Sequence, residues 1–263
     1  MTKLKKIMIT GVIFIIIGTL GSLLTFRDNG IDIAEEKVFK EGNITSVEIE
    51  SNNAAVEIIP TTDSETKVEV VGKGSKDTRT NLTAKVERET LIVKLEEKQL
   101  GFIHLDFGSL TLRISLPEKQ YKSMRVNNDN GKIDVANLSV EQLKAESDNG
   151  RIEMKNILSE NIDVQSDNGR VALEHVTGSI KGKTSNGKIS ILTATLDRPI
   201  ELETNNGSIE IETEEEPTNV TFDVQVDNGS INILDKYKGS TVIGNGENLV
   251  KLKTNNGKIQ VLK

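Results

Sequence analysis

The sequence contains no cysteine and no tryptophan, only two histidines and four prolines, and aromatic residues make up 3% of it. Without cysteine there is no disulfide framework, no thiol nucleophile and no cysteine-ligated zinc or iron–sulfur site. With so few aromatic rings the chain also lacks the stacking platforms on which sugar-processing sites usually depend. The formal net charge is −7. Because nucleic-acid binding depends on a basic surface, we expect no nucleic-acid partner.

One long apolar run lies near the beginning of the sequence, where residues 7–26, IMITGVIFIIIGTLGSLLTF, contain no charged side chain. Twenty residues of helix span roughly 30 Å, the thickness of the hydrocarbon core of a bilayer. Three lysines precede the run and only Arg27 closely follows it, so the positive-inside rule keeps the N-terminus cytoplasmic. We therefore predict a single-pass signal anchor in the cell membrane, with the C-terminal domain extracytoplasmic. A cleaved signal peptide is the alternative, although SLLTF matches a cleavage site poorly.

A repeat built around Asn-Gly occupies the second half of the chain. The dipeptide is followed by one polar residue and then Ile or Val seven times, at intervals of 18 to 20 residues over the first five copies and of 22 and 28 after them. Counted from each glycine, positions −7, −5, +2 and +4 are almost all apolar, whereas −4, +1 and +3 are almost all polar. This alternation on both sides of a turn indicates two half-buried strands per unit. The predicted turn residues are Asn130, Gly131, Asn149, Gly150, Asn168, Gly169, Asn186, Gly187, Asn206, Gly207, Asn228, Gly229, Asn256 and Gly257.

Two architectures fit such a unit: a meander of hairpins, or a β-solenoid with one coil of about 19 residues per repeat. Asn-Gly is a strong hairpin signal, since both residues tolerate positive φ. However, equivalent strands are neighbours only in a solenoid, where identical residues form ladders. Position −1 is always Asn and position −3 carries a hydroxyl in five of seven copies. We therefore predict an all-β fold, a β-solenoid preceded by one transmembrane helix, in which these side chains bond their copies in adjacent coils.

The predicted organisation follows from these patterns. Residues 1–6 form a cytoplasmic tail, 7–26 the anchor, 27–42 a polar tether and 43–263 the extracytoplasmic solenoid domain. That domain is regular over 124–263 and less regular over 43–123, where residues 47–58, VEIESNNAAVEI, form a cryptic unit with Ala54 at the glycine position. Four further strand-like runs precede residue 118, and we expect them to form antiparallel pairs.

With the anchor, the segment LRISLPEKQYKSMRVNNDNGKIDVANL at 112–138 and the recurring DNG[KR][IV] motif, the sequence resembles a bacterial family of β-strand repeats named "putative adhesin". This is a domain of unknown function, and the sequence resembles in particular its membrane-anchored LiaG-like proteins. The resemblance covers the chain after residue 40. It implies a β-solenoid ectodomain. For LiaG-like proteins it also implies a gene that lies beside those of a cell-envelope-stress response. It supplies no catalytic residue.

Neither histidine has the neighbours that acid–base or metal chemistry requires. His175 occupies position +6, where earlier repeats have Asn137 and Asn156, and His104 alternates along a strand-like segment. The aspartates at position −2 form a broken stripe that a calcium-binding β-roll could use, but the nonapeptide of such proteins is absent and Asp beside Asn-Gly has a sufficient role in the turn. We expect no cofactor and no metal.

We therefore predict a non-enzymatic, membrane-anchored cell-envelope protein, a scaffold or adhesin-like module whose partner is an envelope protein or a cell-wall polymer. The alternatives are a polysaccharide-active β-helix enzyme and a membrane signalling accessory. The candidate partner-binding residues are Phe102, Phe107 and Tyr237, which lie in the less regular parts of an aromatic-poor chain. Phe102 and Phe107 could equally belong to the core.

Overall fold

The computed structural model describes residues 31–40, 43–74, 78–99 and 109–263. These residues contain β-strands and no helix, and hence no helix able to cross a membrane. The predicted anchor, His104, Phe102 and Phe107 lie outside the described residues. The strands are β1 (Ile31–Phe39), β2 (Ser46–Ser51), β3 (Ala55–Thr61), β4 (Thr66–Gly74), β5 (Thr78–Glu87), β6 (Thr90–Gln99), β7 (Ser109–Pro117), β8 (Gln120–Asn128), β9 (Ile133–Ala136), β10 (Ser139–Ser147), β11 (Ile152–Lys155), β12 (Leu158–Ser166), β13 (Val171–Glu174), β14 (Ser179–Asn186), β15 (Ile189–Thr193), β16 (Ile200–Asn206), β17 (Ile209–Thr213), β18 (Val220–Ile233), β19 (Thr241–Ile243) and β20 (Asn248–Leu262).

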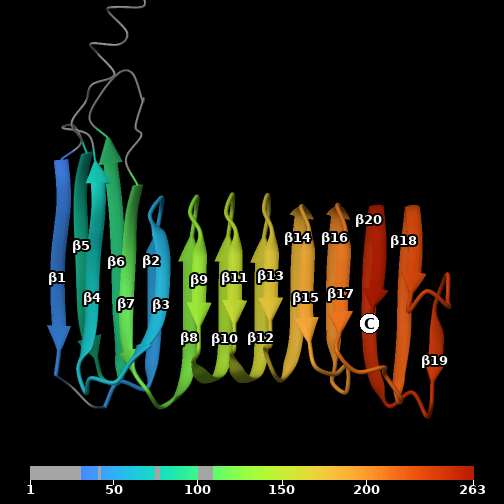
Figure 1. Ribbon diagram of the computed structural model, residues 1–263. Coiled ribbons are helices and arrows are strands. Elements are labelled where there is room, and N and C mark those ends of the chain that lie inside the picture. Colours follow the sequence, from blue (N-terminus) through green and yellow to red (C-terminus); the bar gives the residue numbers. More distant parts are fainter. Residues whose placement is uncertain (1–30, 41–42, 75–77, 100–108) are drawn as a thin grey trace, which may run out of the picture.

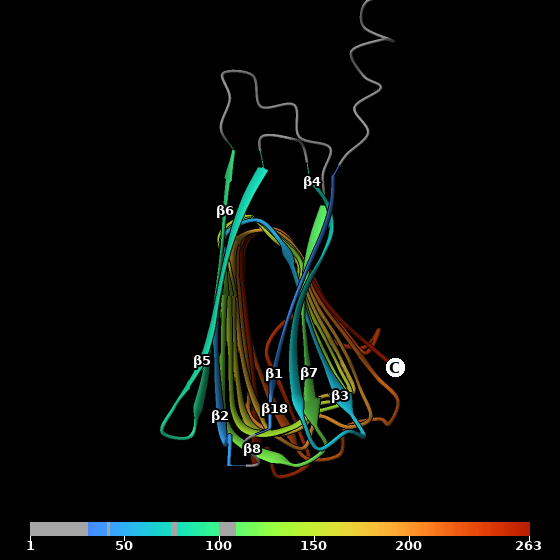
Figure 2. The same cartoon turned by 90° about the vertical axis from the view of Figure 1, so that its left-hand side faces the viewer.

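The strands stack into an elongated rack (Figure 1). In each regular coil one strand rises to an Asn-Gly turn at the top and the next strand descends from it, so the rack has two facing sheets. Sheet A contains the rising strands, such as β8, β10 and β12, and sheet B the descending ones, such as β9, β11 and β13. Viewed along the stack, the sheets meet in a narrow arch at the top and are further apart at the bottom (Figure 2).

Neighbouring coils pair in parallel and in register, so equivalent residues of the repeat lie side by side. In sheet A, Leu143 of β10 is the partner of Ile162 of β12, and in sheet B, Ile152 of β11 is the partner of Val171 of β13. The same register continues through β14–β17. The solenoid prediction is therefore confirmed, and the meander is wrong, because equivalent strands are neighbours.

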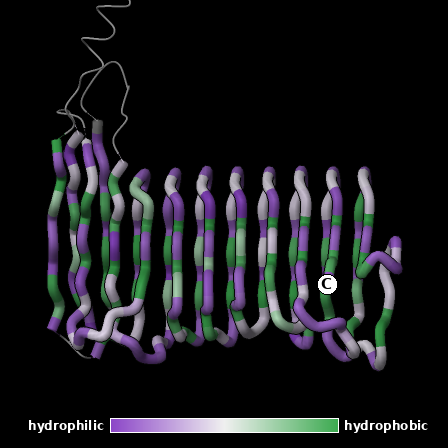
Figure 3. Tube along the Cα trace, viewed as in Figure 1, coloured by the Kyte–Doolittle hydropathy of each residue, from purple (hydrophilic) through white to green (hydrophobic). Residues whose placement is uncertain are grey.

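The core fills the space between the two sheets, and the predicted apolar columns line it. Figure 3 shows the alternation of apolar and polar residues along the strands. At position −7, Met124, Leu143, Ile162, Ile180 and Ile200 are all at most 3% exposed. Burying a side chain of this size contributes roughly 1.5–3 kcal/mol, so each added coil extends the core by several such contributions.

The order of coils in space differs from the order in the chain at both ends of the rack. At one end, β20 lies between the β16–β17 coil and β18, so the outermost coil is β18. At the other end, β2 and β3 lie between β8–β9 and the strands β6 and β7. The expected antiparallel pairs exist, as β4 with β7 and β5 with β6. These pairs extend sheet B and sheet A respectively.

The predicted polar tether, residues 27–42, is wrong over Ile31–Phe39, which form strand β1. This strand pairs antiparallel with β4 along its whole length. Ile33 and Phe39 are half-buried and pack against the core. The segment is polar overall, but every second side chain faces the sheet, and this alternation is sufficient for an edge strand.

Glycine is required in the turns, but for a different reason from the one predicted. Only Gly229 and Gly257 of the seven turn glycines have positive φ, at 155° and 157°. Instead, each turn packs so closely on the preceding one that a side chain has no room. A Cβ added at Gly169 would lie 1.7 Å from the carbonyl oxygen of Gly150, and one at Gly150 would lie 2.0 Å from that of Gly131. Positive φ occurs six residues later, at Asn137, Asn156 and His175.

The buried hydroxyls at position −3 also behave differently from the prediction. Ser166 donates to the carbonyl oxygen of Gly150 at 3.1 Å, and Thr254 donates to that of Gly207 at 3.2 Å. Thr204 donates in the same way to the carbonyl oxygen of Gly187, so in these three coils the partner is the turn carbonyl of the neighbouring coil and not the copy of the same side chain. This hydrogen bond satisfies a buried polar group inside the arch, where leaving it unpaired is costly. The buried hydroxyls of Ser147 and Thr184, at the same position, form no hydrogen bond with a described residue.

Replacing Gly169 with valine should destabilise the domain by about 1–3 kcal/mol, the usual cost of overpacking a tight interior. The matched control is Gly239→Val, because a Cβ at Gly239 meets no atom within 4 Å. Urea denaturation of both variants checks this. Equal midpoints for the two variants would show that the stacked turns tolerate a side chain.

Candidate functional site

An open groove of about 920 Å³ crosses the outer face of sheet A, and we call it the sheet A groove. It runs from Glu48 of β2 across β8, β10, β12, β14 and β16 to Leu249 and Lys251 of β20. Its floor contains the −7 column of the core, and its sides are formed by the outward residues at positions −8 and −6. The groove therefore presents one similar set of side chains per coil.

The groove follows from an irregularity that is repeated from strand to strand. In β10, Val140 and Leu143 are both buried, so the two residues between them, Glu141 and Gln142, both lie toward the outer face. The pairing of β10 with β12 also skips Glu141. Two successive outward residues break the alternation of the strand, and because β12 skips Glu160 at the same place the two strands stay in register, unlike at a β-bulge, where one strand alone has an extra residue. The same step occurs between Tyr121 and Met124 in β8, and we attribute this end of the hollow to these aligned irregularities.

Charged side chains at position −6 line the groove, but most are already paired. Arg125 lies 3.1 Å from a carboxylate oxygen of Glu146, and Lys251 lies 3.2 Å from one of Glu201. Lys181 and Asp163 are exposed register partners in the neighbouring strands β14 and β12, and neither is within ion-pair distance of an opposite charge in the described ranges. These two residues therefore offer one positive and one negative group to a ligand near the middle of the groove.

At the β20 end the groove meets exposed apolar residues. Leu249 of β20 is 46% exposed and Val242 of β19 is 60% exposed. Both are register partners of Thr221 in β18, so the three residues form one row across the outer face of sheet A. Pro199 continues this row on β16. We call Pro199, Leu249, Thr221 and Val242 the apolar strip.

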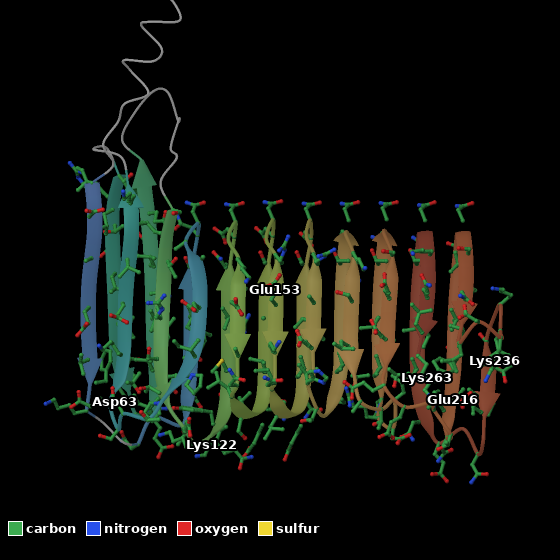
Figure 4. All side chains as sticks on the ribbon, in the orientation of Figure 1. Asp63, Lys122, Glu153, Glu216, Lys236 and Lys263 are labelled. Carbon is green, nitrogen blue, oxygen red and sulfur yellow. The ribbon has the colours of Figure 1, made fainter. Side chains whose placement is uncertain are left out.

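The turn asparagines form a continuous ladder of carboxamides along the top of the rack, where Figure 4 shows a row of side chains. Each Nδ2 donates to the Oδ1 of the asparagine in the adjacent coil, for example from Asn149 to Asn130 at 2.9 Å and from Asn168 to Asn149 at 3.0 Å. The predicted bonding between copies is thus confirmed for position −1. In spatial order the ladder contains Asn53, Asn130, Asn149, Asn168, Asn186, Asn206, Asn256 and Asn228.

The outer face of sheet B is covered by ion pairs between neighbouring coils. Glu153, labelled in Figure 4, accepts from Lys132 at 2.7 Å and from Arg151 at 3.2 Å. The hydrogen bond from Lys132 is the main reason why the pKa of Glu153 is lowered from 4.5, against a smaller opposing effect of burial. Exposed pairs of this kind contribute little individually, and they leave this face with few groups free to bind a partner.

Within the ranges that the structure describes, no three His, Asp or Glu side chains are placed to hold a metal ion. His175 is a turn residue with φ of 49°, matching Asn137 and Asn156 in the same column, and its Nε2 lies 3.8 Å from Glu214. Tyr237 is 37% exposed and exchanges backbone hydrogen bonds with Ile233 beside β18. The structure does not place Tyr237 among the groove residues.

Sequence reasoning missed the sheet A groove and the apolar strip. The signal was present, because aligning the repeats puts Lys181 and Asp163 in one column and Leu249 in another that is otherwise mostly polar. What the alignment lacks is the irregularity in the strands, since two adjacent outward residues are indistinguishable from an ordinary loop in sequence.

Comparison with known proteins places this architecture in a family. The Toastrack DUF4097 model matches residues 44–172 and again residues 133–262. The chain belongs to this family. No curated protein matches the chain, but solved structures do at low identity.

A "putative cell adhesion protein" from Clostridium sporogenes is 15% identical, with 88% of this chain and 99% of that chain covered and a TM-score of 0.41. A "putative adhesin" from Bacteroides fragilis is 11% identical, with coverage of 88% and 97% and a TM-score of 0.44. Another "putative adhesin", from Parabacteroides distasonis, is 11% identical, with coverage of 89% and 98% and a TM-score of 0.36.

The Glu153 ion pairs should make part of the stability depend on acid pH. A carboxylate whose pKa is lowered by folding stabilises the folded state above its unfolded value of 4.5, and this contribution is lost as the pH falls through the folded pKa. The destabilisation caused by Glu153→Gln should therefore be present at neutral pH and shrink in acid. Urea denaturation across this pH range measures it.

Glu160→Gln is the control for this test, because Glu160 is exposed and its carboxylate forms no ion pair with a described residue. A difference between wild type and Glu153→Gln that stays constant from neutral to strongly acid pH would contradict the assignment.

Proposed function

We propose that this Toastrack protein is a non-enzymatic, adhesin-like binding module that residues 7–26 hold in the bacterial cell membrane, with the rack outside the cell. We propose further that it binds an extended cell-wall polymer along the sheet A groove. The observation that carries this is the groove itself, with unpaired Lys181 and Asp163 near its middle and Leu249 at its end. The proposed link to an envelope-stress response is supported only by the LiaG-like resemblance of the sequence.

The direction of the groove favours an extended ligand over a compact one. Strands in a sheet are about 4.8 Å apart, so a groove that extends over seven strands, from β2 to β20, is roughly 30 Å long. A polymer lying along it contacts one set of side chains per coil, and many weak contacts add up along the chain. An envelope protein that inserts an extended segment is the other occupant that this shape admits.

Binding of the full-length chain in detergent to purified cell walls tests the proposal. Lys181→Glu removes the unpaired cation and Leu249→Ser removes an apolar contact, and each should weaken binding about tenfold, which corresponds to about 1.4 kcal/mol. The matched controls are Arg170→Glu, which alters an exposed cation of sheet B, and Leu158→Ser, which alters a residue that is 60% exposed elsewhere.

Controls that lose binding as strongly as the groove variants would remove the groove from the proposal. Binding to membrane vesicles containing envelope proteins, with none to purified walls, would identify a protein partner instead. Release of soluble fragments from the walls would favour the polysaccharide-active enzyme over the adhesin-like module.

The anchor is tested separately by cell fractionation. The full-length chain should stay with the membrane after an alkaline wash, because a transmembrane helix is held by burial of its apolar side chains. A chain in which polar residues replace 7–26 should be released or remain in the cytoplasm. Recovery of the wild-type chain in a shortened, soluble form would indicate a cleaved signal peptide.

A further inference from the structure

Asn-Gly is the dipeptide at which proteins deamidate most readily, since glycine leaves the following backbone nitrogen unhindered. The described residues contain eight such dipeptides. Seven are the turn pairs of the repeat, and the eighth is Asn245–Gly246, between β19 and β20. All eight asparagines are exposed to solvent, so exposure alone does not distinguish them.

The reaction has two steps. The backbone nitrogen of the glycine loses its proton to base and attacks the asparagine Cγ, and the Cγ–Nδ2 bond breaks with release of ammonia, which leaves a cyclic imide. Water then opens the imide at either carbonyl, giving aspartate or isoaspartate. The net change is one water consumed and one ammonia released. The carboxamide must therefore turn toward the backbone, and both its atoms must be free to move.

The asparagine ladder opposes this movement. Six Asn-Gly asparagines, among them Asn149 and Asn168, are held at both amide atoms, because Nδ2 donates to one neighbour and Oδ1 accepts from the other. In two turns that lie outside the strands the attacking nitrogen is also engaged: Gly187 donates to the Asn206 carbonyl at 3.1 Å and Gly207 donates to the Asn256 carbonyl at 2.9 Å.

Two asparagines are held less well. Asn228 ends the ladder: it donates to Asn256 at 3.0 Å, but its Oδ1 accepts from no residue that the structure describes. Asn245 has no hydrogen bond to the described part of the chain, and its glycine is in a left-handed turn with φ of 71°. The side chain thus makes two ladder hydrogen bonds in the six inner asparagines, one in Asn228 and none in Asn245.

We propose that, of the eight Asn-Gly pairs in the described residues, Asn245–Gly246 is the one that deamidates first, and that the ladder protects the seven turn asparagines in proportion to the number of bonds each makes. Inside the ladder an aspartate has no amide donor, so its oxygens face the Oδ1 of the next asparagine. At Asn245 the new carboxylate meets no such opposition.

The consequence at Asn245 is local and changes the surface charge. A Cβ at Gly246 would lie 2.7 Å from a methyl group of Val242, so the turn adjoins the apolar strip. Deamidation therefore adds a negative charge beside Val242. An effect of this charge on ligand binding rests on the proposed function, but the deamidation itself does not.

The test uses the full-length chain in detergent micelles, incubated in mildly alkaline buffer and sampled over time. Peptide mass spectrometry follows conversion of carboxamide to carboxylate at each of the eight sites. We expect Asn245 to react at least roughly tenfold faster than the doubly bonded members, with Asn228 between them, because each net hydrogen bond is worth a factor of several. The same chain unfolded in urea should react at similar rates at all eight sites.

Asn149→Ala provides a second, independent test. It removes the donor to Asn130 and the acceptor for Asn168, so both neighbours should deamidate faster, whereas Asn206, several coils away, should be unchanged. Circular dichroism verifies that the variant remains folded. Ladder asparagines that react as fast as Asn245 in the folded chain, or an Asn245 that stays intact there, would overturn the proposal.

Discussion

The close stacking of the Asn-Gly turns is the contact on which the rack depends. Each turn glycine lies against the backbone carbonyl of the equivalent residue in a neighbouring coil, which is Ala54 for Gly131 and a glycine for the others, with no space for a side chain. That approach sets the distance between coils at the arch, where the two sheets are connected. It also brings the asparagine side chains within hydrogen-bonding distance and the position −3 hydroxyls within reach of the turn carbonyls. A bulkier residue at any of these glycines separates all three sets of contacts together.

Much of this fold could be predicted from the sequence because equivalent positions of successive repeats carry similar side chains. Residues such as Leu143 and Ile162 alternate with polar neighbours, and this alternation predicts both the strand and the face of it that is buried. The reason why the turns contain glycine could not be predicted from the sequence, because a need for positive φ and a lack of space for a side chain both select glycine. The prediction of a tether over residues 27–42 was wrong for a related reason. Ile33 and Phe39 are separated by charged residues, so the sequence does not indicate a strand there.

The candidate site was less predictable than the fold, because it depends on the few outward positions at which one repeat differs from the others. Ion pairs cover most outward positions of the coils, and exposed pairs of this kind are close to neutral in energy. What distinguishes sheet A is therefore the small number of groups left over, Lys181 and Asp163, and the apolar side chain of Leu249. These three side chains matter because they line a groove in the outer face of sheet A. The groove depends on backbone conformation, at the points where two successive residues of a strand face outward.

The exchanged order of coils at the two ends has a consequence for how such a protein changes length. A solenoid with strictly sequential coils can gain or lose a repeat anywhere, including at its ends. Here β20 is inserted inside β18, and β2 with β3 lies inside β6 and β7, so each end is an interlocked unit that a single duplication would disrupt. The coils between β8 and β17 have no such constraint. Duplication of a whole coil there preserves both ends, so the middle of the rack is the part whose length can change without disturbing the pairing at either end.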